Sequence, residues 1–139
     1  MTTDGAPDVR ESWPHGRVLP LVQLTASAVY FGALATVLGR AWTVVGHIYL
    51  PRQGDRYDNL AFWPGELRGL RGLLGALLFI GPFVTGMAAG LGILRLIITP
   101  PALDPRRWLT TCAGTALALT AFIVSLTPWS QTAFSWLLD

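Results

Sequence analysis

The sequence predicts an all-α integral membrane protein with three transmembrane helices. Its clearest feature is a run of 23 residues, from Gly72 to Leu94, that holds no charged side chain. An α-helix needs about 20 residues to cross the roughly 30 Å hydrocarbon core of a bilayer. Two more apolar runs flank this one, before Arg40 and after Arg107. Only 13% of the residues are charged, against about 25% in soluble domains.

The first span is expected at about residues 19–47, after a polar tail of residues 1–17. Pro20 fits the first turn of a helix, where its missing N–H leaves no bond unmade. The chain stays apolar beyond Arg40, whose side chain can reach the membrane surface from within the span. Pro51 is the first definite stop. This apolar run exceeds the 7–15 residues of a signal peptide, so we expect no cleavage after it.

The second span is expected at about residues 67–99, after an interfacial segment. Residues 51–59 are rich in turn-forming side chains. Trp63 precedes Arg68 and Arg71, and this combination of an aromatic ring with arginines is typical of an interfacial anchor. Pro82 lies in the middle of the span and has no N–H to donate, which predicts a kink.

The third span is expected at about residues 108–127, with Trp108 as an anchor at its start and Pro128 after its end. In residues 128–139, four apolar side chains have the spacing i, i+4, i+7 and i+8: Trp129, Ala133, Trp136 and Leu137. This spacing places them on one face of a helix. We therefore expect a short amphipathic helix in the interface, anchored by Trp129 and Trp136. Residues 18–139 are expected to form one membrane domain.

The charged residues do not determine the orientation in the membrane, but the composition favours a bacterial source and argues against nucleic-acid binding. Three spans would place five arginines on each side of the membrane, so the positive-inside rule gives no clear answer. Arg106 and Arg107 lie in a short loop beside a span, which favours a cytoplasmic N-terminus. The absence of lysine and the abundance of Ala, Gly, Leu and Pro are typical of a GC-rich bacterial genome. Scattered arginines and a net charge of +2 argue against nucleic-acid binding.

Small side chains recur every four residues in the three spans. They allow membrane helices to approach closely, because removing side chains brings the backbones into contact. This pattern predicts a helix-packing face or partner interface formed by Ala28, Gly32, Thr36, Gly86, Gly90, Gly114 and Ala118. Packing within the chain and docking onto another subunit both remain open for it.

No catalytic, cofactor or metal site is expected. No Asp, Glu, Lys or His lies near the middle of a span, and the hydroxyl groups there are expected to bond back to their own helix carbonyls. His47 lies near the water boundary, whereas His15 is beyond the opposite end of the same helix, so a bis-histidine haem is not expected. A single cysteine, Cys112, excludes an intrachain disulfide.

Taken together, these features favour a non-catalytic subunit or assembly partner of a larger complex in the bacterial cell membrane. Its expected partners are the lipid bilayer and another integral membrane protein or a second copy of itself. The alternative is a small oligomeric pore, carrier or membrane-permeabilising protein, although no span shows the continuous polar stripe of a wet pore. A third hypothesis is a membrane enzyme or redox subunit that uses His47 with Arg52 or Arg56.

Gly86 and Gly90 allow a test of the packing hypothesis. At a close helix contact, replacing either glycine with leucine should cost about 1–3 kcal/mol through overpacking, whereas a leucine facing lipid is harmless. We expect Gly86→Leu and Gly90→Leu to lower membrane abundance or partner recovery, and Leu91→Ile to change neither. Normal abundance and recovery for both glycine variants would mean that this face meets lipid.

Overall fold

The computed structural model describes residues 18–47, 63–99 and 105–138, and this part of the chain is 93% helical and without strands. The elements are α1 (Val18–Val45), the 3₁₀ turn η2 (Gly65–Leu67), α3 (Arg68–Ile98), α4 (Pro105–Ser125) and α5 (Pro128–Leu138). Three of these segments are long and apolar enough to cross a membrane: α1, η2 with α3, and α4. The all-α class and the three candidate spans are thereby confirmed. The tail 1–17 and the loop 51–59 lie outside the described residues.

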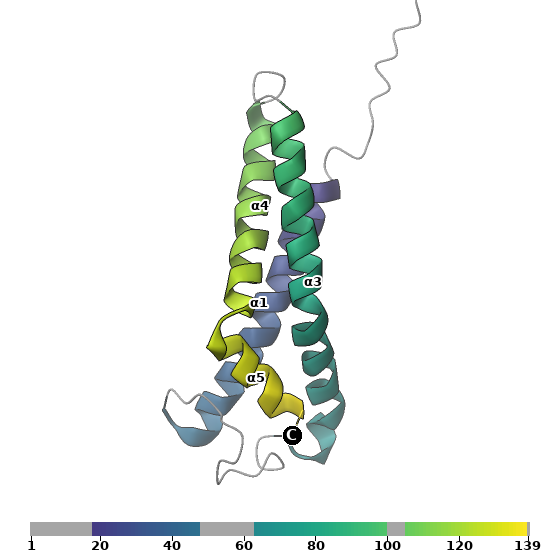
Figure 1. Ribbon diagram of the computed structural model, residues 1–139. Coiled ribbons are helices and arrows are strands. Elements are labelled where there is room, and N and C mark those ends of the chain that lie inside the picture. The colour runs from purple at the N-terminus through teal and green to yellow at the C-terminus, as the bar shows by residue number, and fades with distance from the viewer. Residues whose placement is uncertain (1–17, 48–62, 100–104, 139) are drawn as a thin grey trace, which may run out of the picture.

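The three long helices form one bundle with α5 folded against it (Figure 1). α3 packs along both α1 and α4, and α1 also contacts α4. α3 and α4 run side by side from the end at which they are connected, while α1 crosses behind them and diverges from α3 toward the other end (Figure 1). The bundle is therefore narrow at one end and wide at the other.

α1 ends at a glycine rather than at the proline that the sequence pattern indicated. Gly46 has a φ of +79°, in the left-handed region that glycine adopts without a side-chain clash. Its N–H donates to the carbonyl of Trp42 at 2.8 Å. A glycine in this conformation satisfies a free carbonyl at the end of a helix. The helix thus stops two residues before the predicted boundary.

α5 covers a part of the bundle that α4 is too short to reach. α4 has 21 residues and α3 has 31, which at 1.5 Å per residue leaves about 15 Å of α3 without its neighbour. Leu126 and Thr127 donate to carbonyls three residues earlier and turn the chain after α4. The 11 residues of α5 then run from the end of α4 toward the start of α3 (Figure 1).

Contacts with all three helices hold α5 in place. The hydroxyl groups of Tyr30 on α1 and Ser130 on α5 lie 2.6 Å apart. Arg71 on α3 donates from Nε to the carbonyl of Leu137 at 2.8 Å, near the C-terminal end of α5, where the helix dipole favours a positive charge. The rings of Trp63 and Trp136 lie 6.4 Å apart and both are buried. α5 is therefore part of the hydrophobic core.

The two tryptophans of α5 provide a matched test of this docking. Trp136 is 4% exposed and Trp129 is 54% exposed. We expect Trp136→Ala to lower the free energy of unfolding by about 3–5 kcal/mol, because it empties a buried aromatic site. Trp129→Ala should change it by less than about 0.5 kcal/mol. Thermal unfolding of both purified variants in the same mild detergent measures the difference, and equal losses would contradict a docked α5.

Candidate helix-docking surface

The interior of the narrow end is held together by one carboxamide. Gln23 on α1 is fully buried, and its Nε2 donates to the carbonyl of Ala88 on α3 at 2.8 Å and to Oγ1 of Thr115 on α4 at 3.1 Å. A single side chain thus joins all three long helices. On the same face of α1, Ser27 donates to the carbonyl of Gln23 at 2.7 Å. Gln23 is the only amide side chain inside a predicted span, and this signal could have identified it from the sequence.

Two glycines make room for this carboxamide. A Cβ on Gly114 would lie 2.6 Å from Oε1 of Gln23. A Cβ on Gly92 would collide with Nε2 of Gln23 and Oγ1 of Thr115. Glycine is thus required at both positions because the polar group occupies the space that a side chain would need. Gly114, a predicted packing residue, lies in the core, while Gly92 was not among the predicted set.

Most hydroxyl groups on the helices bond within their own helix, as expected. Thr85, Thr120 and Ser125 each donate to a carbonyl three or four residues earlier. Such bonds satisfy the hydroxyl without a partner helix. By contrast, the side-chain pairs Gln23 with Thr115 and Tyr30 with Ser130 cross between helices.

A strip of small side chains runs along the outward face of α1, flanked by larger exposed side chains such as Leu24, Val29 and Trp42. It includes three of the predicted packing residues, which the structure places on the surface rather than in the core. We call the set the small-residue face; its members, all exposed, are Thr25, Ala28, Gly32, Ala35, Thr36 and Gly39. Thr36 donates to the carbonyl of Gly32 at 2.7 Å, so its hydroxyl hydrogen is already used. No atom lies within 4 Å of a Cβ built on Gly32 or Gly39.

Large apolar side chains predominate on the outward face of α3, which has no comparable strip of small ones. They include Phe79, Ile80, Phe83, Val84, Met87, Leu91, Leu94, Ile97 and Ile98, and the exposed small residues of α3 are Gly69, Gly72, Ala76 and Gly90. Bulky side chains of this kind suit contact with lipid, whereas small residues are enriched where membrane helices meet one another. The two outward faces therefore suit different neighbours.

The other predicted packing residues divide between core and surface. Ala118 is fully buried. Gly86 is half-buried, and a Cβ there would lie 3.0 Å from Cδ2 of Phe122 on α4. Gly90 is exposed, with no atom within 4 Å of a Cβ at that position. Of the two glycines, only Gly86 lies at a contact between helices of this chain. A leucine at Gly90 would therefore disturb packing only if another molecule contacts that position.

The predicted interfacial anchors also fall into two groups, one at the surface and one in the core. Arg68 and Trp129 are exposed, and Trp108 and Arg71 are half-buried. Trp63 and Trp136 are buried against each other, so their rings contribute to packing rather than to an exposed aromatic belt. The aromatic pattern alone could not separate the two roles, because a tryptophan beside a span suits either one.

The described residues contain no group of three or more His, Cys, Asp or Glu side chains that could hold a metal ion. His47 is exposed just beyond the end of α1, and Cys112 is half-buried on α4. Arg52 and Arg56, which the enzyme hypothesis would combine with His47, lie outside the described part of the chain.

Comparison with family models, curated proteins and solved structures finds no match to this chain. The fold itself defines the class: an all-helical bundle whose three long segments have the length and composition of membrane spans. Its candidate functional surface is the small-residue face of α1.

The glycines around Gln23 give a prediction with one control, on α3. Gly92→Ala and Gly114→Ala should each destabilise the bundle by about 1–3 kcal/mol, because the new methyl group overlaps the Gln23 carboxamide or Thr115. Gly90→Ala should be neutral or stabilising by up to about 1 kcal/mol, since that position is open and alanine favours helix. Thermal unfolding in detergent measures each change.

The double variant Gly114→Ala with Gln23→Ala identifies the source of the loss. Removing the carboxamide removes the overlap, so the double variant should be more stable than the sum of the single losses implies. Strict additivity would show that Gly114 is required for a reason other than the space taken by Gln23.

Proposed function

We propose that this chain is a small integral protein of the bacterial cell membrane, a non-catalytic subunit that assembles with another membrane protein through α1. The observation that carries the proposal is the continuous strip of small exposed side chains on α1, whereas large apolar side chains predominate on the outward face of α3. Small residues are enriched where membrane helices meet one another, which supports a helix rather than lipid as the neighbour of this strip. The partner is best described as a transmembrane helix whose side chains fill the small-residue face.

The energetics of membrane helices support this choice of partner. Lipid tails solvate apolar side chains as well as protein does, so helices associate through close packing and interhelical hydrogen bonds. On α1 the exposed positions at Ala28, Gly32 and Thr36 lie four residues apart and form one continuous strip. A partner helix could approach the α1 backbone closely there, and would gain dispersion contacts that lipid chains make less well.

The filled interior of the bundle favours this role over that of a pore within one chain. Val37, Ala118 and Ala121 are fully buried between the helices, and Gln23 fills the space beside Gly92 and Gly114. A pore would therefore have to form between several copies. We propose the end that carries Arg95, Arg106 and Arg107 as the cytoplasmic side, because α3 and α4 are connected there by a short arginine-flanked loop.

Gly32→Leu tests the proposed surface. Because the position is open in the isolated chain, leucine should leave the fold and the unfolding temperature nearly unchanged. It should remove a partner seated on α1, since a side chain would stand between the two backbones. The measurement is recovery of stoichiometric companions with a tagged chain at native expression in mild detergent, where we expect a loss of at least about fivefold, equivalent to about 1 kcal/mol.

The matched control is Val84→Leu on the bulky face of α3, which should recover companions like the wild type. A tagged wild-type chain that migrates alone, with no companion and no second copy, would disprove the subunit role. Solute leak from liposomes that increases with the amount of reconstituted chain would instead support the oligomeric pore.

A further inference from the structure

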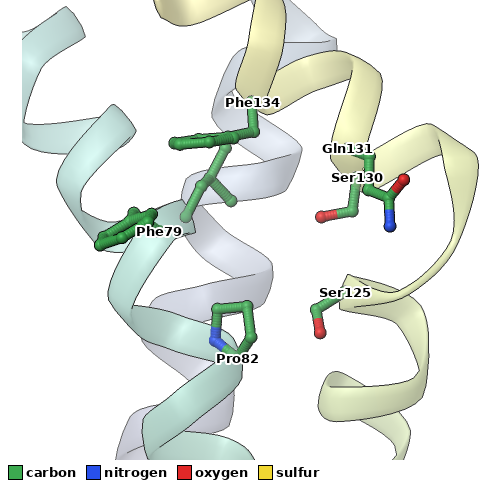
Figure 2. A pocket seen from close by; sticks show the side chains of 7 residues that line it. Phe79, Pro82, Ser125, Ser130, Gln131 and Phe134 are labelled. Carbon is green, nitrogen blue, oxygen red and sulfur yellow. The ribbon is translucent and has the colours of Figure 1, made fainter.

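A small recess lies beside Pro82, which is inside the continuous helix α3, at the point where the chain turns from α4 into α5. Its volume is about 140 Å³. α3 contributes Leu78, Phe79 and Pro82 to its lining, and Ser125, Ser130 and Phe134 come from the turn region and α5. Figure 2 shows Pro82 and Ser125 on opposite sides of it, with Ser130 and Gln131 on the α5 side.

The proline leaves a backbone acceptor beside the recess. Residue 82 has no N–H, so the carbonyl of Leu78 lacks its regular helix donor. The nearest hydroxyl on the same helix is used elsewhere: Thr85 donates to the carbonyl of Gly81 at 2.8 Å and lies 3.3 Å from that of Pro82. In a membrane span, a carbonyl freed in this way needs a neighbouring polar group or an ordered water.

The opposite side of the recess offers further polar atoms. Ser125 donates to the carbonyl of Phe122, and Ser130 forms a hydrogen bond with Tyr30. Each hydroxyl oxygen has two acceptor sites, so each can still accept a hydrogen. Gln131 reaches the carbonyl of Leu126 only at 3.4 Å, and its NH₂ group carries a second hydrogen to donate.

The recess has the polar partners and the volume that water needs. A water molecule takes about 30 Å³ in the liquid and binds where two to four polar partners surround it, so the recess has room for several. An acyl chain in the same place would leave the freed carbonyl and the hydroxyl oxygens without partners, at a cost in free energy. Phe79 and Phe134 stack with ring centroids 5.8 Å apart and form the apolar wall.

We infer that this recess is a water-binding site beside Pro82, and that it stays hydrated where the adjoining outward faces meet lipid. The inference depends on the proposed membrane location of the chain. Water in the recess would donate to the Leu78 carbonyl, which lacks the N–H of residue 82, and would itself be held by polar atoms of α4 and α5.

Thiol labelling distinguishes water from lipid at this depth. In a Cys112→Ala background, Ser125→Cys places a thiol in the recess, and Ile123→Cys, two residues earlier on α4 and 55% exposed, places one on the outward face. Only the thiolate reacts, and it forms in water but not in hydrocarbon. We therefore expect a charged methanethiosulfonate reagent, applied to open membrane fragments, to label Ser125→Cys about tenfold faster or more.

Because Ser125 is only 6% exposed, slow labelling has to be read together with the measurement of bound water described below. Equally slow labelling of the two variants, with no transfer from water in that measurement, would overturn the water site while leaving the proposed function intact. Equally fast labelling would overturn it as well, and would in addition contradict the membrane location on which the proposed function rests.

A second measurement needs no substitution and applies if Ser125→Cys fails to accumulate. In lipid nanodiscs, nuclear magnetisation should transfer from water to protons of Leu78 and Pro82, but not to those of Ile123. Absence of transfer to both recess residues would exclude bound water there.

Discussion

The hydrogen bonds of the Gln23 carboxamide determine how the three long helices meet. One group on α1 reaches a backbone carbonyl on α3 and a hydroxyl on α4, so sliding any helix by one residue would break at least one of these bonds. The glycines at 92 and 114 are required by this group, since any side chain there would occupy its place. Burying a polar group is costly unless it is hydrogen-bonded, so the two bonds of Nε2 favour one arrangement of the helices. The buried Oε1 of the same carboxamide has no hydrogen-bond partner among the described residues.

The other end of the bundle is organised by a difference in length. α4 is ten residues shorter than α3. Without α5, the diverging ends of α1 and α3 would therefore enclose an open wedge. α5 fills that wedge with Ala133, Trp136 and Leu137. Its attachment combines apolar burial with two directed bonds, from Arg71 and between Ser130 and Tyr30. Polar contacts therefore fix the geometry at both ends, and small or apolar side chains fill the space between them.

The sequence predicted the helices well because their signal is local. Charge-free runs and prolines locate α1, α3 and α4 within three residues of their observed ends, and the amphipathic pattern locates α5. The direction in which each face points was harder to predict. Ala28 and Gly32 carry the same small-residue pattern as Gly114 and Ala118, yet the first pair faces outward and the second pair faces the core. Composition along one helix cannot distinguish these cases, because the answer depends on which neighbour is present.

The position of Gln23 along the chain has a consequence for how the protein is made. Its partners lie 65 and 92 residues later in the sequence, on α3 and α4. A ribosome adds about 5–20 residues per second, so several seconds pass before Thr115 has been synthesised. In the proposed membrane location, α1 must meanwhile keep an unpaired carboxamide in water, in the insertion machinery or against a temporary neighbour. The hydrogen bonds of Gln23 inside the bundle are therefore complete only after the third long helix, α4, has been synthesised.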